Sequence, residues 1–377
     1  MSLNKKILVV FGTRPEAIKM APLVKALCND VSMITKVCVT AQHRSMLDQV
    51  LDIFDIKPDY DLNLMMNSQS LEQLSTRILL AISEVLEEMV PDLVLVHGDT
   101  TTTSMVSLAC FYRHIPIGHV EAGLRTGNLQ APWPEEFNRR LTGMLSTLHF
   151  APTVKAAENL LSEKIDPENI EITGNTVIDA LFQMTDYLKN NKIYKNILNK
   201  KFNFIDRSKK LILVTGHRRE NFGQGMIEIC NALKEIGLRS DIQIIYAVHL
   251  NPHVKGPVDS ILSNIPNIYL IPPQDYMSFV YLLTRCYIVL TDSGGIQEEA
   301  PSLGKPVLVM RETTERPEAV EAGAARLVGT KSMNIVAAVE NLLNNMDVYE
   351  EMANANNPYG DGSAAKKITK RILKYFE

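Results

Sequence analysis

The sequence lacks the features of several specialised protein classes. No apolar run approaches the length of a membrane span, and the run from Ile7 to Phe11 is too short for a signal peptide. The five cysteines are odd in number and scattered, which argues against a disulfide framework. Neither C-x-x-C nor H-E-x-x-H occurs, and His97 and Asp99 have no third metal ligand nearby in the sequence. We therefore expect a cytoplasmic protein with reduced thiols, no membrane segment and no metal.

The charge balance excludes another class of partner. Lysine and arginine number 39 and aspartate and glutamate 43, so the formal net charge is -4. This balance gives no reason to expect nucleic acid as a main partner. Hydrophobic residues make up 46% of the 377 residues, which is enough for two cores of ordinary size. We expect two domains, with any basic site confined to a small region.

Short apolar, partly β-branched runs alternate with segments of helical spacing along the chain. The predicted strands are residues 6–11, 37–40, 93–96 and 115–120, then 211–215, 242–249, 268–271 and 287–290. This alternation is typical of parallel sheets with helical crossovers. The sequence predicts an α/β protein with two Rossmann-like β/α/β domains that face each other across a cleft.

The predicted domain boundaries follow the same pattern. The first domain comprises residues 1–173 together with an amphipathic helix at 364–377, and the second comprises residues 174–363. The stretch 186–210 is rich in lysine and asparagine and is a plausible hinge.

The stretch 286–318 suggests a phosphate site in the second domain. A strand leads into Ser293, Gly294 and Gly295, and these residues open a helix whose first turn is expected to carry Glu298 and Glu299. Glycines allow a ligand to approach the backbone, and the free N–H groups of a helix start favour an anion. An acidic residue there could accept hydrogen bonds from ribose hydroxyls. An ordinary strand-to-helix turn is the alternative.

Polar residues also follow the strands of the first domain, where ligands bind in parallel sheets. The first strand lacks the G-x-G-x-x-G dinucleotide fingerprint and instead offers Arg14 and Lys19, which could reach a pyrophosphate. Glu121 follows an apolar strand in a loop bounded by glycine, which favours a functional role. Asp99 could equally be a helix cap, and Glu135 could be a first-turn acid that complements a helix dipole.

His217 ends a predicted strand and precedes two arginines. For this residue a phosphate or proton-transfer role is favoured over that of a core histidine.

Several motifs in this order resemble those of one enzyme family. The motifs are Phe11-Gly12-Thr13-Arg14-Pro15-Glu16, Val96-His97-Gly98-Asp99-Thr100-Thr101, Gly118-His119-Val120-Glu121-Ala122-Gly123-Leu124-Arg125, Pro132-Trp133-Pro134-Glu135-Glu136, Thr215-Gly216-His217-Arg218-Arg219-Glu220 and Thr291-Asp292-Ser293-Gly294-Gly295. Over nearly its whole length the chain resembles the non-hydrolysing UDP-N-acetylglucosamine 2-epimerases of bacteria. The resemblance implies a glycosyltransferase-B-type fold, a homodimer, and interconversion of UDP-N-acetylglucosamine with UDP-N-acetylmannosamine for surface polysaccharides.

The resemblance also implies roles for individual residues. The implied catalytic residues are Asp99, Glu121, Glu135 and His217. The residues implied to contact the nucleotide sugar are Arg14, Lys19, Phe279, Ser293, Gly294, Gly295, Glu299 and Arg316. Gln42, His43, Arg218 and His249 match a site at which some bacterial members bind a second UDP-N-acetylglucosamine as activator.

The implied reaction explains the need for carboxyl groups. Carbon 1 of the sugar is an acetal carbon, so loss of the carbon 2 proton alone leaves no stabilised anion. Elimination of UDP to a 2-acetamidoglucal, followed by re-addition, avoids this obstacle without a cofactor, and it needs proton-exchanging carboxyl groups and a stabilised pyrophosphate. The alternatives are a glycosyltransferase of the same fold, a hydrolysing epimerase that releases free N-acetylmannosamine, and a non-enzymatic nucleotide-sugar sensor.

Overall fold

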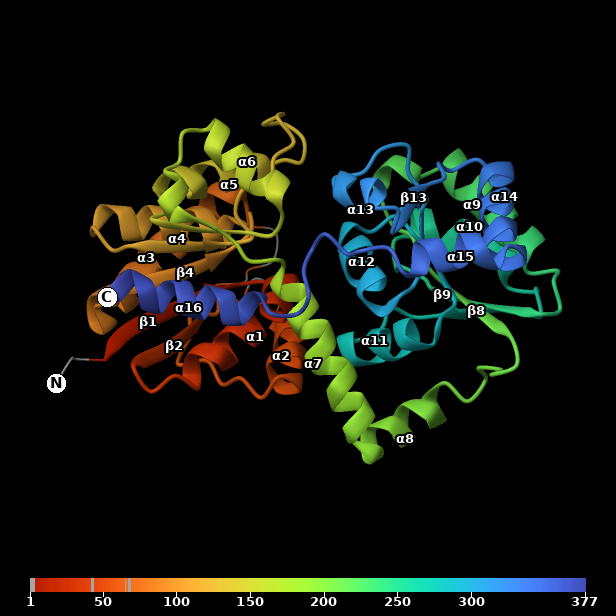
Figure 1. Cartoon of the computed structure of the whole chain (residues 1–377), viewed down its shortest axis with the longest axis horizontal. Helices are drawn as coiled ribbons and strands as arrows, with labels where there is room; N and C mark the ends of the chain where they lie inside the picture. The colour runs from red at the N-terminus through yellow and green to blue at the C-terminus, as the bar shows by residue number, and fades with distance from the viewer. Residues whose placement is uncertain (1–3, 42–43, 65, 67–68) are drawn as a thin grey trace. The chain divides into compact units, whose positions relative to one another are not determined.

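The chain forms two compact α/β units. A computed structural model describes residues 4–41, 44–64, 66 and 69–377 (Figure 1). Unit 1 consists of Met1–Ala180 and Tyr359–Glu377, and unit 2 consists of Leu181–Pro358. Each unit contains one parallel sheet with helices between successive strands, so the predicted α/β class with two Rossmann-like domains is confirmed.

Unit 1 has a seven-stranded sheet in the order β3-β2-β1-β4-β5-β6-β7. The strands are β1 Lys5–Phe11, β2 Met33–Val39, β3 Tyr60–Asp61, β4 Leu93–His97, β5 Ile117–Val120, β6 Leu148–Ala151 and β7 Ile170–Ile172. The helices are α1 Arg14–Cys28, α2 Arg44–Ile53, α3 Leu71–Met89, α4 Thr101–Tyr112, α5 Glu135–Leu145, α6 Val154–Ser162, the 3-10 turn η1 Pro167–Asn169, α7 Thr176–Asn190, which continues into unit 2, and α16 Ala364–Phe376. From β1 at the centre the chain adds β2 and β3 on one side, and then β4 to β7 on the other side. The strand order therefore reverses between β1 and β4.

Unit 2 repeats this topology with six strands in the order β10-β9-β8-β11-β12-β13. The strands are β8 Lys210–Thr215, β9 Ile242–Ala247, β10 Ile268–Ile271, β11 Ile288–Thr291, β12 Val307–Val309 and β13 Ala325–Leu327. The helices are α8 Lys192–Lys201, η2 Arg219–Asn221, α9 Gln224–Ile236, α10 Pro252–Leu262, α11 Tyr276–Arg285, α12 Gly294–Glu299, η3 Ala300–Leu303, α13 Pro317–Glu321, α14 Ser332–Asn344 and α15 Met346–Ala353. Here the order reverses between β8 and β11.

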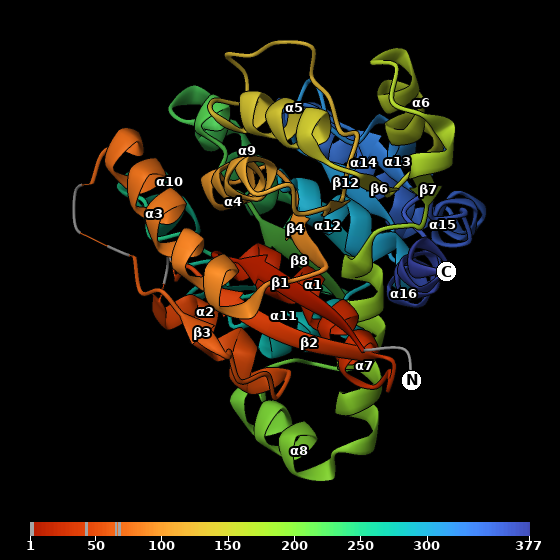
Figure 2. The same ribbon diagram turned by 90° about the vertical axis from the view of Figure 1, so that its left-hand side faces the viewer.

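Strands buried on both faces account for the continuous apolar runs in the sequence. In unit 1, Leu8 and Val10 of β1 pack in one cluster with Ile78 and Ile82 of α3. Figure 2 shows α3 and α4 on this side of the sheet, with α1 and α16 on the other. Since side chains alternate along a strand, the intervening β1 residues face the second helical layer.

The C-terminal helix α16 belongs to unit 1 and packs against α1 (Figure 1). Its first turn is held by Asp179 of α7, whose carboxylate accepts hydrogen bonds from the backbone N–H groups of Ala364 and Ala365 at 3.1 and 2.9 Å. Burial raises the pKa of Asp179, while these two bonds act in the opposite direction. The unit bounds nevertheless differ from the predicted division after residues 173 and 363, because unit 1 includes the first part of α7 and the loop that begins at Tyr359.

The stretch 186–210, predicted as a hinge from its lysine and asparagine content, is mostly helical. It contains the end of α7, the whole of α8 and a short turn before β8. Asn191 caps α8 by accepting a hydrogen bond from the backbone N–H of Tyr194 at 3.2 Å, and Leu198 is buried. The polar side chains of α8 therefore lie on a helix that is held by the buried Leu198, while its Ile193 and Ile197 are exposed.

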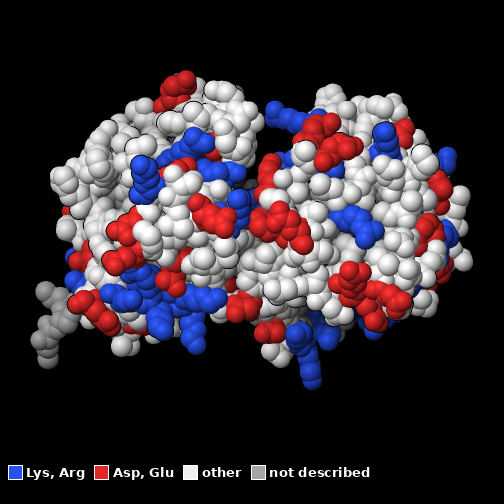
Figure 3. All heavy atoms as spheres, turned by 45° about the horizontal axis from the view of Figure 1, so that its top comes forward, with Lys and Arg blue, Asp and Glu red and all other residues white. Residues whose placement is uncertain are grey.

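The described surface agrees with the small net charge. Acidic and basic side chains are mixed over most of the face shown in Figure 3, with a group of basic side chains at its lower left. None of the helices in the described part of the chain has the length and apolar character required to cross a membrane. Four of the five cysteines, Cys38, Cys110, Cys230 and Cys286, are buried as free thiols, whereas Cys28 is exposed.

Two histidines buried in neighbouring strands make unit 1 sensitive to acid. Burial lowers the pKa of His119 in β5 to about 3 and that of His149 in β6 to about 4, from an ordinary value of 6.5. Between these values the unfolded chain binds more protons than the folded chain. The stabilising effect of the neutral rings is therefore fully present above pH 6.5 and is lost as the pH falls toward the folded values.

We predict that His119→Gln reduces this acid sensitivity. Between pH 7.5 and pH 5 the wild-type unfolding free energy should fall by about 2 kcal/mol for each such histidine. The variant should lose about 2 kcal/mol less over the same interval, even if it is less stable at pH 7.5. Urea unfolding followed by the fluorescence of Trp133, the single tryptophan, measures the change. An equal loss in both proteins would contradict the prediction.

Candidate active site

The loops that follow β1, β4 and β5 lie together at the carboxyl edge of the unit 1 sheet. A buried carboxylate, Glu16 in the first turn of α1, joins two of these loops. Its Oε2 accepts hydrogen bonds from the backbone N–H groups of Gly12 and Thr13 at 3.1 and 2.8 Å, and its Oε1 accepts one from the Thr100 hydroxyl at 2.8 Å. Burial raises the pKa of Glu16, and its hydrogen bonds act against that rise. Helix α1 starts at Arg14, three residues before the predicted start, because this capping box orders its first turn.

Glu121 stands directly after β5 in a left-handed backbone conformation, with φ of 62°. A residue other than glycine rarely adopts this conformation unless the surrounding structure imposes it. The Glu121 Oε2 forms a very short ion pair with the Lys19 ammonium and accepts a hydrogen bond of 2.7 Å from the Asn175 amide. His97 Nε2 lies 3.8 Å from the same oxygen, and burial lowers the pKa of His97 to about 4. Glu121 is therefore held in place by the Lys19 ammonium and the Asn175 amide, with the buried His97 ring beside it.

Asp99 follows β4, one strand away from Glu121. Its carboxylate forms a very short ion pair with Arg139, and its backbone carbonyl accepts a hydrogen bond of 3.0 Å from the Asn138 side chain. The helix cap that could have explained Asp99 is supplied by Thr100, whose hydroxyl accepts a hydrogen bond from the Thr103 N–H at 3.2 Å. Asp99 is thus available for another role.

Glu135 and its neighbour Glu136 have different surroundings. Glu136 is fully buried and accepts hydrogen bonds from the backbone N–H groups of Thr126 and Gly127 at 3.1 and 3.3 Å, so it holds the loop before α5. Glu135 is the first residue of α5 and is partly exposed, and it forms no ion pair within the described part of the chain. Its position allows either the dipole role or a chemical role.

The predicted contacts of two cations with phosphate remain predictions. Arg14 lies at the first position of α1, beside the loop after β1. Lys19 lies one turn further along, and the structure directs its ammonium to Glu121. Gln42 and His43, predicted to contact an activator, lie outside the described residues.

In each sheet the strand order reverses at one place, which we call the switch point: between β1 and β4 in unit 1, and between β8 and β11 in unit 2. At the switch point of unit 2, Thr215 and Thr291 are paired in the β-sheet register. Their hydroxyl groups are 2.7 Å apart. Asp292, the next residue after β11, is completely buried. Its Oδ2 accepts hydrogen bonds of 2.8 Å from the backbone N–H groups of both His217 and Arg218, so it fixes the loop after β8.

His217 projects from that loop with 44% of its side chain exposed. Its ring stacks on His249, with ring centroids 5.2 Å apart and planes inclined by 16°. Partial burial lowers the pKa of His217, Asp292 raises it, and His249 and Arg218 lower it further. Arg218 lies 3.5 Å from the Glu315 carboxylate. The adjacent residues His217 and Arg218 thus lie beside His249, which is 32 positions further along the chain.

The short helix α12 begins at Gly294, as the glycine turn predicts, with Ser293 at its N-cap. Glu298 and Glu299 fall in the second turn and are buried. Glu298 forms a very short ion pair with Arg316, and Glu299 accepts a hydrogen bond of 3.2 Å from the Tyr276 hydroxyl. Phe279, in α11, is partly exposed.

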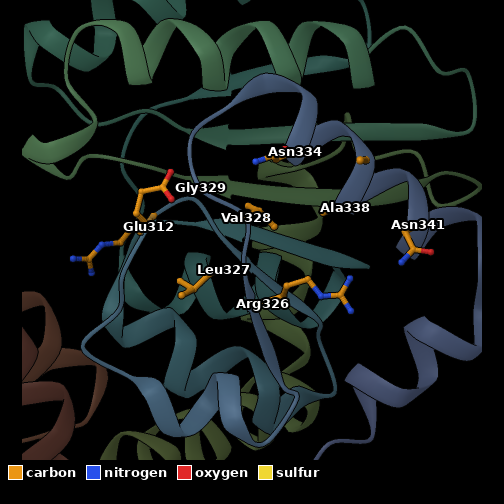
Figure 4. A pocket seen from close by; sticks show the side chains of 10 residues that line it. Glu312, Arg326, Leu327, Val328, Gly329, Asn334, Ala338 and Asn341 are labelled. Atoms are coloured by element: carbon orange, nitrogen blue, oxygen red, sulfur yellow. The ribbon is translucent and has the colours of Figure 1, made fainter.

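A separate pocket of about 480 Å³ lies between β13 and α14 in unit 2, where Figure 4 shows Arg326, Asn334 and Asn341 along it. None of the predicted site residues lines it. Within the described ranges, no group of three or more His, Cys, Asp or Glu side chains is placed to hold a metal ion.

Sequence analysis missed the residues that hold the candidate groups in place. These are Glu16, Arg139, Asn175, Tyr276 and Asp292. A helical spacing of four residues separates Arg139 from Glu135, which indicates a shared helix face. No local pattern indicates that Asn175 reaches a loop 54 positions earlier.

The fold is that of a two-domain α/β protein of the glycosyltransferase-B type. Unit 1 carries carboxylates at its switch point. Unit 2 carries the loop with His217 beside the glycine-rich start of α12. The family model described as UDP-N-acetylglucosamine 2-epimerase matches residues 25–373. A Campylobacter jejuni UDP-N-acetylglucosamine 2-epimerase is 59% identical over 374 residues, covering 98% of each chain. The solved UDP-GlcNAc 2-epimerase of Neisseria meningitidis, bound to UDP-GlcNAc, is 53% identical with a TM-score of 0.91, covering 98% of this chain and 100% of that one. The chain belongs to the UDP-N-acetylglucosamine 2-epimerase family.

The loop that carries Glu121 depends on a close approach at Gly123. This glycine has φ of +89°, and a Cβ atom there would lie 2.1 Å from the Ala156 carbonyl oxygen. The Gly123 carbonyl also accepts a hydrogen bond of 2.9 Å from Asn159 of α6. Gly127 in the same loop has φ of +78° but no atom within 4 Å of such a Cβ, which makes it a matched control.

We predict that Gly123→Ala lowers the unfolding free energy by several kcal/mol, whereas Gly127→Ala lowers it by about 1–2 kcal/mol. The difference isolates the clash with Ala156 from the cost of the left-handed backbone. Urea unfolding at pH 7.5, followed by the fluorescence of Trp133, measures both variants. Equal losses would show that close packing against α6 is not what holds this loop.

Proposed function

We propose that this protein is a non-hydrolysing epimerase that interconverts UDP-N-acetylglucosamine and UDP-N-acetylmannosamine by elimination and re-addition of UDP. Family membership supports the substrate, because the relatives that match almost the whole chain are UDP-N-acetylglucosamine 2-epimerases. The observation that carries the mechanism is Glu121, an ion-paired carboxylate in a left-handed backbone directly after β5.

The first requirement of the elimination is a base. A base must remove the carbon 2 proton while the bond between carbon 1 and the UDP oxygen breaks, which gives the 2-acetamidoglucal and UDP. A cation beside a carboxylate stabilises the ionised form, and this form can accept a proton. Glu121 beside Lys19 and Asp99 beside Arg139 both meet this condition. Together with Glu135 they supply the carboxyl groups for the two sugar faces.

The departing diphosphate needs donors and positive charge. In unit 2 the loop after β8 supplies His217 and Arg218, and the start of α12 supplies backbone N–H groups at Gly294 and Gly295. Arg218 Nη2 lies 3.8 Å from the position of a Cβ on Gly294, so these two groups are neighbours. We assign the diphosphate to this place, with Ser293 and Arg316 beside it. Arg14 and Lys19 are assigned to contacts with the nucleotide sugar. Glu299 is assigned to the ribose and Phe279 to the uracil.

We also propose that a second UDP-N-acetylglucosamine activates the enzyme through Gln42, His43, Arg218 and His249. The stacking of His249 on His217 supports this assignment, because a ligand on His249 would act directly on a neighbour of the reacting diphosphate. We assign the protein to the cytoplasm, where activated sugar nucleotides are made.

Deuterium incorporation tests the function and the role of Glu121 together. UDP-N-acetylglucosamine incubated with the wild type in deuterium oxide, without added nicotinamide, metal or acceptor, should yield UDP-N-acetylmannosamine deuterated at carbon 2. Glu121→Gln should reduce this exchange by at least about 10³-fold, while UDP binding by calorimetry stays nearly unchanged, because the proposed nucleotide contacts are mostly in unit 2.

Glu158 of α6 has a side chain that is 57% exposed, so Glu158→Gln is the matched control and should retain full exchange. Release of free N-acetylmannosamine would indicate a hydrolysing enzyme. No turnover despite UDP binding would favour a transferase or a sensor. Unchanged exchange in Glu121→Gln would remove this residue from the mechanism.

We further propose a homodimer that forms through α3, α4 and α5. These helices are neighbours, and they carry large apolar side chains on the surface: Leu80 is 64% exposed, Tyr112 62%, Phe137 50% and Met144 75%. Clustered exposed apolar residues on adjoining helices are typical of a protein interface. A second copy of the chain is the partner that satisfies a self-complementary contact.

We predict that Leu80→Glu combined with Met144→Glu converts the dimer into a monomer. Buried like charges and lost apolar contacts should weaken association by at least about 10²-fold. Light scattering during size-exclusion chromatography measures the mass. Leu238→Glu, at a site in unit 2 that is 75% exposed, is the control and should leave the dimer intact. A dimeric double variant, or a monomeric wild type, would refute this interface.

A further inference from the structure

Asp292 does more than fix the loop after β8. Its Oδ2 already accepts three hydrogen bonds: from the backbone N–H groups of His217 and Arg218 at 2.8 Å each, and from the Asn221 side chain at 3.2 Å. That oxygen accounts for the anchoring of the loop. The second oxygen, Oδ1, is buried and accepts no hydrogen bond within the described part of the chain. A buried carboxylate oxygen without a donor is costly, so its surroundings indicate a function.

The ring of His217 lies beside Oδ1, with its Nδ1 3.8 Å away. The ring is also flanked by His249, which stacks on it, and by Arg218 on the same loop. The phenol of Tyr246 approaches the loop from β9 and donates to the Gly216 carbonyl at 3.3 Å. Of these groups only Asp292 attracts a proton to His217, whereas His249 and Arg218 oppose a positive charge on it.

We propose that Asp292 is a positioning residue that keeps a proton on Nδ1 of His217 and thereby makes His217 a cationic donor to the departing diphosphate. With Nδ1 protonated, the neutral ring carries a lone pair on Nε2. Nε2 then bears a proton only when the whole ring is an imidazolium. A charged donor stabilises the developing negative charge of UDP more strongly than a neutral one. The role of the charged donor rests on the proposed function, whereas the position of the proton does not.

The proton position can be measured on the wild-type protein without substrate. Labelling with ¹⁵N-histidine and a pH titration give the tautomer of each neutral ring, and His217→Gln identifies the resonances of His217 by their loss. The expected result is a neutral His217 with its proton on Nδ1. A neutral ring with its proton on Nε2 would overturn the inference, and this measurement holds whether or not any Asp292 variant folds.

Asp292→Asn tests the cause. The amide oxygen can still accept the hydrogen bonds of the loop, but the NH₂ group would face Nδ1 and donate to it. The neutral ring should then carry its proton on Nε2, the titration midpoint of His217 should move to lower pH, and turnover should fall by about 10²-fold with a smaller change in KM. An unchanged midpoint and tautomer would overturn the inference.

Asn221→Ala is the matched control. It removes the third donor to Oδ2 without touching Oδ1, so it should leave the tautomer and midpoint of His217 unchanged. A shift as large as that of Asp292→Asn would show that loop order alone matters, and would overturn the role of Oδ1. If the proton position is as expected but the protein does not epimerise its substrate, the proposed function fails while the positioning by Asp292 stands.

Discussion

In each unit the candidate site residues depend on one buried carboxylate, which accepts hydrogen bonds from backbone N–H groups at the switch point of the parallel sheet. In unit 1, Glu16 binds the loop after β1 and reaches Thr100 after β4. In unit 2, Asp292 stands after β11 and binds the loop after β8. In both units the loops after the first and the fourth strand are joined. The carboxylate comes from the helix after the first strand in unit 1 and from the loop after the fourth strand in unit 2.

Because of this difference, the remaining carboxylate oxygens have different partners in the two units. Glu16 performs the anchoring in unit 1, and the side chains of Asp99 and Glu121 are each paired with a cation. In unit 2 Asp292 uses only one oxygen for anchoring, and the other faces an imidazole. An uncompensated carboxylate in either place would be costly to bury, so the neighbouring cations and amides are as necessary as the carboxylates.

Much of this arrangement could be predicted from the sequence, because it follows from local patterns. The run 93–96 indicates a buried strand and the helical spacing of 71–89 indicates α3, whose bounds the structure confirms. Since parallel strands end at one edge of a sheet, the polar residues that follow them must gather there, and Asp99 and Glu121 do so. The proposed roles of these residues come from their type and from the resemblance.

The partners of those residues could not be predicted, because the contacts join positions that no local pattern connects. Lys19 resembles a phosphate ligand in the sequence, yet its ammonium meets Glu121 across 102 positions. A long lysine side chain on a helix can either bind a phosphate or pair with a carboxylate. The position of α1 relative to β5 determines which partner the lysine reaches. The local structure of the stretch 186–210 was also not predicted: a capping Asn191 and a buried Leu198 produce a helix there, and its role as a hinge stays a prediction.

The pairing of Lys19 with Glu121 also limits how the proposed reaction can proceed. A carboxylate bound tightly to an ammonium is a weaker base than a free one, since protonation must work against the attraction of the cation. The loss of the carbon 2 proton is therefore favoured when that cation finds a second anion. The diphosphate of the substrate is such an anion, and Lys19 is already implied to contact it. We propose that a phosphate group of the substrate competes with Glu121 for the Lys19 ammonium. The contact of Lys19 with phosphate stays a prediction beside the observed ion pair.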